Sequence, residues 1–157
     1  MNVPAALLWG FAATTVLTTL MAGSQVVGLS RMSIPFLLGT MVTPDRDRAM
    51  LAGIGIHFLN GWIFALVYVM AFETLGRATW WLGALAGLLH GLFVLVVVLP
   101  LLPAVHPRMA SERQGPTPTR LLQPPGFLAI HYGRRTPLIA LLAHVAYGAL
   151  LGGLYVV

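Results

Sequence analysis

The fold of this chain is decided by residues 79–103, which read TWWLGALAGLLHGLFVLVVVLPLLP. The stretch contains no charged side chain and exceeds the roughly 20 apolar residues that a helix needs to cross a bilayer. Further apolar stretches of similar length lie at about residues 4–22, 51–72 and 137–157. We therefore expect an all-α membrane protein with four transmembrane helices.

The composition supports the same class. Hydrophobic residues make up 58% of the chain and charged residues only 8%, whereas about a quarter of the residues in a soluble domain are charged. The 157 residues suit a single membrane domain, with inner connections at 23–50 and 104–136. Because the chain has no cysteine, disulfides, thiolate metal sites and covalently attached c-type haem are excluded.

The basic residues predict the orientation in the membrane. All nine are arginines, and only Arg77 lies in the connection between the second and third spans. Short loops rich in arginine stay on the cytoplasmic side, so we expect both termini on the non-cytoplasmic side of a bacterial inner membrane. The others lie in the first and third connections: Arg31, Arg46, Arg48, Arg108, Arg113, Arg120, Arg134 and Arg135.

These arginines also indicate what the protein contacts. We expect Arg108, Arg134 and Arg135 to meet lipid headgroups or a protein partner. A nucleic-acid partner is not expected, because no aromatic residues are interleaved with the arginines on a soluble fold. The inner connections add a short apolar segment at 33–42, predicted to be a helix at the membrane interface, and a proline-rich loop.

Glycines recur at helical spacing inside the predicted spans. Glycines on one helical face let neighbouring membrane helices approach closely. We therefore expect helix contacts, within the chain or between chains, at Gly53, Gly61, Gly83, Gly87, Gly91, Gly148 and Gly152.

Three of the five histidines, His57, His90 and His144, lie inside the predicted spans. An imidazole is costly in hydrocarbon, so a membrane histidine usually faces the protein interior and is a functional candidate. Counted from the helix starts at ~1.5 Å per residue, His57 and His144 both lie about 12 Å deep and His90 nearer 20 Å. His57 and His144 are thus the predicted pair, and His90 is the weaker candidate.

The second and fourth spans share the pattern His-x3-Gly-x3-small-x2-Tyr, which predicts a two-helix internal repeat. Parallel repeats about an axis along the membrane normal occur in membrane proteins. Chance matching among common residues in apolar helices explains the pattern equally well. The matching residues are His57, Gly61, Ala65 and Tyr68, and His144, Gly148, Gly152 and Tyr155.

Two interpretations of the histidine pair remain open. In one, His57 and His144 are axial ligands of a haem b between the second and fourth spans, with Arg134 or Arg135 near its propionates. In the other, each neutral imidazole bonds a neighbouring helix and fixes the packing without a cofactor. We favour the second interpretation, and no metal site is predicted.

No catalytic motif is present: the chain lacks a Ser-His-Asp order, a phosphate-binding glycine loop and HExxH. We therefore expect a non-catalytic accessory or assembly subunit of a larger membrane complex, in contact with other subunits or with its own copies. A haem b or metal-binding electron-transfer protein is the alternative. An oligomeric channel is a more distant one.

Segments 39–48, 57–62 and 131–137 resemble small, uncharacterised four-span bacterial membrane proteins. This resemblance implies a bacterial source and the four-span topology. It implies no activity and no site residues.

Overall fold

The structure is a computed structural model that describes residues 1–111 and 113–157. The described residues form helices and no strand, and four helices are long and apolar enough to cross a membrane. The all-α, four-span prediction is therefore confirmed at the level of length and composition. The four candidate spans are α1 (Val3–Val26), α3 (Arg46–Leu75), a continuous stretch at Trp80–Val105, and α6 (Thr136–Leu154).

Local signals fix where these helices begin and end. The Asp45 carboxylate accepts a hydrogen bond from the Arg48 backbone N–H (2.8 Å), so α3 begins several residues before its apolar run. The same helix ends at Gly76, whose φ of 65° is left-handed and suits glycine. The final residues, 155–157, lie beyond the end of α6.

The third span changes helix type along its length. It consists of α4 (Trp80–Phe93), the π-helical turn η1 (Val94–Val98) and α5 (Leu99–Val105). Pro100 and Pro103 have no N–H to donate, which interrupts the regular α-helical ladder. The wider π turn, in which the Leu99 N–H bonds the Val94 carbonyl, precedes this interruption.

The connections at one end of the bundle contain two short helices. The first is α2 (Ile34–Val42), which Ser33 caps, so the short helix predicted at 33–42 is present. The second is the 3-10 helix η2 (Phe127–Tyr132). Within η2, Leu128 and Ala129 have φ values of 54° and 59°, which non-glycine residues rarely adopt.

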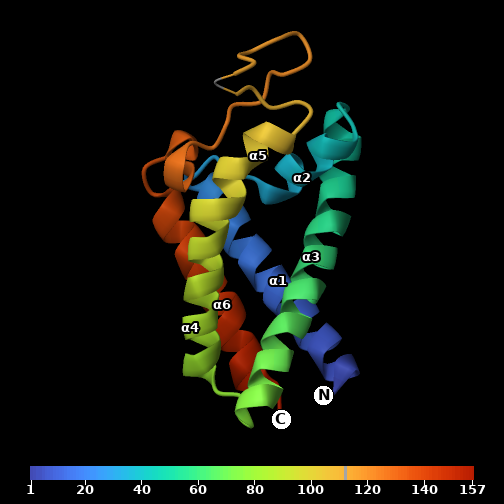
Figure 1. Ribbon diagram of the computed structural model, residues 1–157, viewed down its shortest axis with the longest axis vertical. Helices are drawn as coiled ribbons and strands as arrows, with labels where there is room; N and C mark the ends of the chain where they lie inside the picture. The colour runs from blue at the N-terminus through green and yellow to red at the C-terminus, as the bar shows by residue number, and fades with distance from the viewer. Residues whose placement is uncertain (112) are drawn as a thin grey trace.

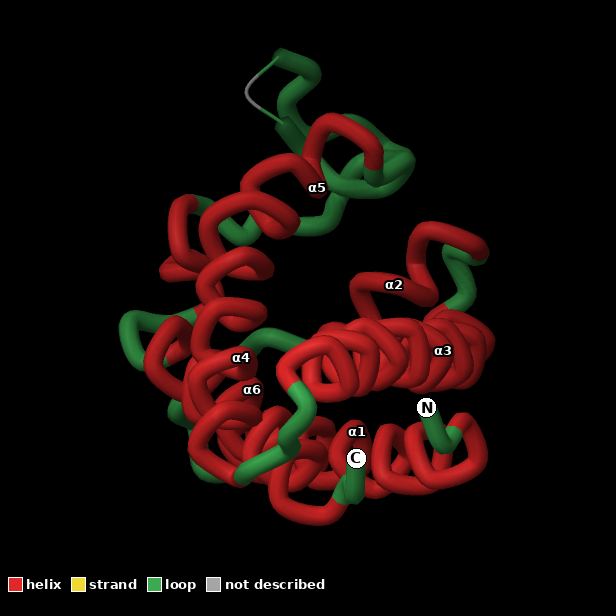
Figure 2. Tube along the Cα trace, turned by 60° about the horizontal axis from the view of Figure 1, so that its bottom comes forward, coloured by secondary structure: helices red, strands yellow, loops and turns green. Residues whose placement is uncertain are grey.

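The long helices form an open arc instead of a closed ring (Figures 1 and 2). In order around the arc, α4 packs along α6, α6 against α1, and α1 against α3, while α2 packs on α3. Only a short turn joins α3 to α4, yet these two helices make few close backbone contacts. The space between them defines the candidate site.

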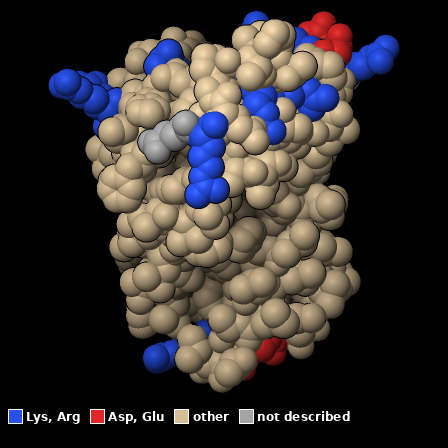
Figure 3. Space-filling view, turned by 45° about the horizontal axis from the view of Figure 1, so that its top comes forward, with Lys and Arg blue, Asp and Glu red and all other residues tan. Residues whose placement is uncertain are grey.

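On the face that Figure 3 shows, the charged side chains lie towards the two ends of the molecule, and the surface between them is almost entirely uncharged. Both termini lie at one end, together with the turn that joins α3 to α4 (Figure 1). The arginine-rich connections lie at the other end. This separation is the one expected for helices that cross a membrane.

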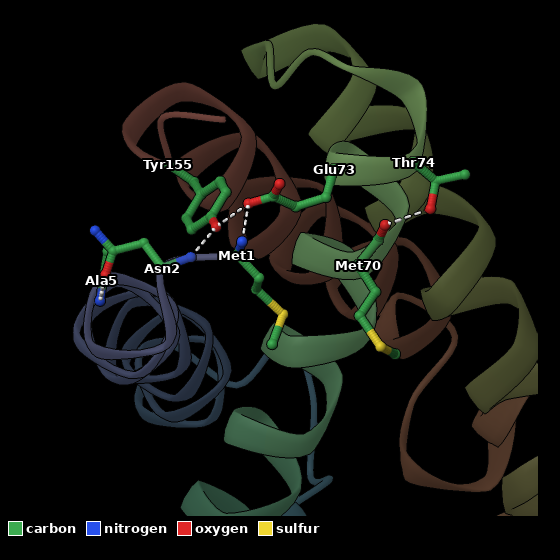
Figure 4. Close-up of polar contacts among 7 residues, drawn as sticks. All are labelled: Met1, Asn2, Ala5, Met70, Glu73, Thr74 and Tyr155. Carbon is green, nitrogen blue, oxygen red and sulfur yellow. Dashed lines mark hydrogen bonds and ion pairs between the residues drawn. The ribbon is translucent and has the colours of Figure 1, made fainter.

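A polar junction joins three helices at the end that holds the termini (Figure 4). The Tyr155 hydroxyl donates to Glu73 Oε1 (2.6 Å) and accepts from the Asn2 backbone N–H (2.8 Å). The Met1 amino group also lies 3.2 Å from Glu73. The ends of α1, α3 and α6 are thereby held together.

Candidate functional site

A close contact between two spanning helices joins α4 to α6 and depends on glycine. A Cβ at Gly83 would overlap the Gly148 carbonyl, and a Cβ at Gly87 would overlap the His144 carbonyl. The two backbones therefore touch directly, as glycine-rich membrane helices allow. The structure places five of the predicted packing glycines in this contact: Gly83, Gly87, Gly91, Gly148 and Gly152.

The other two predicted glycines also contact elements of the same chain. Gly53 lies against the Pro35 carbonyl of α2, and Gly61 lies against the Thr14 side chain of α1. All seven predicted packing glycines therefore face elements of the same chain.

Large aromatic rings hold α3 away from α4. Phe64 of α3 stacks on His90 of α4, with ring centroids 3.9 Å apart and planes inclined by 28°. One turn further along α3, the Tyr68 hydroxyl lies 3.3 Å from His90 Nδ1. Because these rings fill the space between α3 and α4, the backbones of these two helices stay apart. The backbones of α4 and α6, by contrast, touch.

This spacing leaves a cavity of about 160 Å³ inside the bundle, bordered by α1, α2, α3, the α4–α5 span and α6. Its size is close to that of an engineered apolar cavity of about 150 Å³ that stays dry and binds benzene. The wall is almost entirely hydrocarbon, and no charged side chain lines it. The polar residues on the wall are Thr14, His57, Asn60, His90, His144 and Tyr147.

His144 has a fixed tautomer. Its Nδ1 lies 2.7 Å from the Ala140 carbonyl oxygen, which can only accept a hydrogen bond, so Nδ1 carries the proton. In a neutral imidazole the other nitrogen, Nε2, is then an unprotonated acceptor. Nε2 makes no hydrogen bond to any residue that the structure describes.

The structure pairs His144 with His90, whereas the sequence analysis paired it with His57. The His90 and His144 rings meet edge to face, with centroids 4.8 Å apart. Gly91 faces Leu141 and His144, which sets His90 level with His144. The sequence analysis counted the depth of His90 from the end of the third span and that of His144 from the start of α6. These two depths are not comparable, because the third span continues past the level at which α6 begins.

His57 lies on α3 and lines the same cavity as His144, with Asn60 one turn further along. Both side chains are half-buried. Neither makes a side-chain hydrogen bond to another residue in the described part of the chain. The residues that line the cavity thus include two polar side chains without a side-chain hydrogen bond among the described residues.

Two tyrosines complete the polar layer around the histidines. The Tyr147 hydroxyl donates to the Gly61 carbonyl (2.6 Å) and so joins α6 to α3. The Tyr68 and Tyr147 rings meet edge to face at 5.5 Å. Within the described residues, no fully buried side-chain nitrogen or oxygen lacks a partner, so the unused groups lie where the wall is accessible.

A second hollow lies between α3 and α4. It is a groove of about 320 Å³, and Phe64 and His90 line both this groove and the cavity. The stacked Phe64 and His90 rings therefore separate the groove from the cavity.

No group of three histidine, aspartate or glutamate side chains able to hold a metal ion occurs among the described residues. The predicted haem b ligands, His57 and His144, both line the same cavity, one from α3 and the other from α6. Arg134 and Arg135 are exposed at the start of α6.

The proline-rich loop is anchored by a residue that sequence reasoning did not single out as structural. His106 is fully buried, donates from Nε2 to the Leu37 carbonyl (3.0 Å) and accepts at Nδ1 from the Arg108 N–H (3.1 Å). Burial lowers the pKa of His106, and its bond to Leu37 partly opposes this effect. The half-buried Arg108 guanidinium also donates to the Thr40 carbonyl, and its contact with lipid headgroups or a partner stays a prediction.

Comparison with protein-family models, with curated proteins and with solved structures finds no match for this chain. The function must therefore be argued from the site.

Proposed function

We propose that this chain is a non-catalytic protein of the bacterial cytoplasmic membrane that binds a small, neutral, lipophilic molecule inside its helix bundle. The observation that carries the proposal is the apolar cavity whose wall holds His57 and Asn60 without a hydrogen-bond partner in the described residues. Both side chains are half-buried and their polar atoms are not fully enclosed, so a ligand with a matching polar group would bond to them without breaking a side-chain bond among the described residues.

The cavity wall indicates the charge and size of the ligand. No charged side chain is present on the wall to pair with an ion, and an unpaired ion in hydrocarbon is very costly. The volume of about 160 Å³ lies below the roughly 300–1,000 Å³ of typical drug-sized pockets. The cavity therefore suits a single ring or a branched hydrocarbon, or the end of a longer lipid.

This proposal narrows the accessory role that the sequence favoured. The glycines that suggested contacts with other subunits are used between helices of the same chain. In an accessory role of this kind, the protein would hold a lipophilic molecule for a partner.

The first test measures whether toluene stabilises the purified protein. Val94 lines the cavity, so Val94→Phe should fill it, whereas Val96 is 46% exposed on the same π turn, so Val96→Phe serves as the matched control. At ten times its Kd, toluene should raise the melting temperature of the wild type and of Val96→Phe by about 4 °C. The Val94→Phe variant should show no such rise.

The Val96→Phe control also accounts for any effect of toluene on the detergent, because that effect should change the melting temperatures of both phenylalanine variants equally. Equal stabilisation of all three proteins, or none of the wild type, would contradict ligand binding in this cavity.

Haem b binding is the second candidate function. The specific observation in its favour is the His144 Nδ1–H bond to a backbone carbonyl, which is how metal-bound histidines are commonly oriented. His57 is the residue that would supply the other ligand. A macrocycle needs more space than the cavity provides, so the helices would have to separate.

A reduced-minus-oxidised absorption spectrum tests this candidate directly. A haem band in the wild type that disappears in the His57→Ala/His144→Ala double variant would support it. A colourless protein purified under mild conditions would exclude it.

A further inference from the structure

We infer that the ligand of this cavity carries a hydroxyl group, which binds between His144 Nε2 and the Asn60 side chain. The ligand class is then a lipophilic alcohol or phenol. This inference rests on the proposed function, since it names the chemistry that the cavity selects.

One side of the site offers only an acceptor. Because His144 Nδ1–H is bonded to the Ala140 carbonyl, Nε2 can accept a hydrogen bond but cannot donate one. The His144 ring also packs edge to face on the His90 ring, with centroids 4.8 Å apart. A ligand that meets this side must therefore provide a hydrogen-bond donor.

The other side of the site offers donors. Asn60 carries two N–H groups and one carbonyl, and a neutral His57 carries one N–H. The two residues are three positions apart on α3, so they share one helical face. A ligand that meets this side can accept a hydrogen bond from either of them.

A hydroxyl is the smallest neutral group that satisfies both sides, because it donates one hydrogen bond and accepts others. A ketone or an ether accepts only and would leave His144 Nε2 unbonded. An amine would be charged, and no carboxylate lines the cavity to pair with it. The chemistry of the two walls therefore selects an alcohol or phenol.

The other residues that line the cavity indicate the chemistry of the group attached to the hydroxyl. Leu17, Met21, Phe64 and Leu102 line the cavity, so the group attached to the hydroxyl is hydrocarbon. Asn60 lies about 20 Å along α3 from Arg46 at 1.5 Å per residue, in the middle of a helix that crosses the ~30 Å hydrocarbon core. A lipid with a charged headgroup would have to bury that headgroup at this depth, which disfavours it.

The experiment compares p-cresol with toluene, which differ only in the hydroxyl group, and with anisole, which can accept but not donate. Affinities are measured on the full-length protein in detergent and corrected for the partitioning of each compound into detergent alone. We expect p-cresol to bind about tenfold more tightly than toluene, as one well-formed hydrogen bond would give. Anisole should bind no more tightly than toluene.

Two variants test the assigned residues. His144→Phe keeps the ring shape without the lone pair, and Asn60→Leu keeps the volume without the amide. Each should lose the preference for p-cresol, measured as the ratio of the affinities for p-cresol and toluene in the same variant. His131→Phe, at an exposed position in the loop, should retain that preference and serves as the matched control.

The outcomes separate this inference from the proposed function. If p-cresol and toluene bind equally well to the wild type, the hydroxyl inference is overturned and ligand binding stands. If neither binds, the proposed function itself fails. Preference for p-cresol that persists in both His144→Phe and Asn60→Leu would overturn the assignment of these two residues.

Discussion

His106 shows how one buried residue can organise a long connection. It lies in the proline-rich loop, yet both ring nitrogens are bonded, one to α2 through the Leu37 carbonyl and one to the Arg108 N–H. The second bond requires an unprotonated Nδ1, because an N–H cannot accept from another N–H. The loop is therefore held in place by the neutral form of the imidazole.

This arrangement predicts that the loop loosens in acid. Burial lowers the pKa of His106 below its ordinary value of 6.5, and the nearby Arg108 and Arg120 act in the same direction. When the folded-state pKa is the lower one, the stabilisation is complete above pH 6.5 and declines as the pH falls towards the folded-state value. Limited proteolysis of residues 107–125 should therefore accelerate between pH 7.5 and pH 5.

His106→Ala should remove much of this pH dependence and destabilise the protein by about 1–3 kcal/mol at pH 7.5, because two buried partners lose their bonds. His131→Ala is the comparison variant: the exposed His131 ring bonds only the Pro124 carbonyl (3.0 Å) among the described residues, so its loss should destabilise the protein less. A cleavage rate that does not change with pH in the wild type would contradict the prediction.

At the scale of elements, α4 and α6 are two spanning helices whose backbones meet directly. Gly148→Ala would place a methyl group against the Gly83 carbonyl, which belongs to a helix and cannot turn aside. The helices would have to separate, which we expect to cost about 1–3 kcal/mol, as overpacking does in other cores.

Gly55→Ala is the matched control for this prediction. Gly55 also lies inside a spanning helix, and a Cβ there would meet nothing within 4 Å. Alanine there should leave stability unchanged or raise it by up to about 1 kcal/mol. Thermal unfolding in one detergent compares the two variants, and equal melting temperatures would show that the α4–α6 contact is not as close as described.

The helices themselves could be predicted from the sequence, but their neighbours could not. Apolar runs and glycine spacing are local properties, and they locate the spans and the faces that pack. Which glycine face meets which is decided by complementarity between distant segments, here Gly83 and Gly87 of α4 with Gly148 and His144 of α6. Consecutive spans such as α3 and α4 are therefore not necessarily packed neighbours.

Only part of the candidate site could be predicted, because the sequence shows which residues are unusual but not which of them meet. The membrane histidines are visible in the sequence because imidazole is rare and costly in hydrocarbon. Their pairing depends on helix register, which the sequence does not contain. Asn60 lies next to Gly61 on the face that carries His57, and its polarity in mid-span was a signal that sequence reasoning could have used.

At the scale of the whole molecule, small and large residues have opposite effects on the spacing between neighbouring helices of the arc. Glycine draws α4 onto α6, while Phe64 and Tyr68 hold α3 away from His90 on α4. The two effects together create a hollow in a chain of only 157 residues. A cavity made in this way lies between the helices and extends from mid-span to α2.

The orientation of the whole molecule in the membrane follows from its charges. The arginine-rich connections lie at one end, and Arg77 lies at the other, so the arginine-rich end should face the cytoplasm. The absence of cysteine allows this to be tested with single-cysteine variants on a silent background. Thr74→Cys and Thr119→Cys introduce exposed thiols near the opposite ends.

In intact cells, a membrane-impermeant maleimide should label the Thr74→Cys variant and leave Thr119→Cys unlabelled. After permeabilisation both should react, and the wild type should react in neither case. Labelling of Thr119→Cys alone in intact cells would reverse the orientation, and the arginines would then face away from the cytoplasm. The cavity would keep its depth in either case, because Asn60 lies near the middle of α3 and is about equally far from both surfaces.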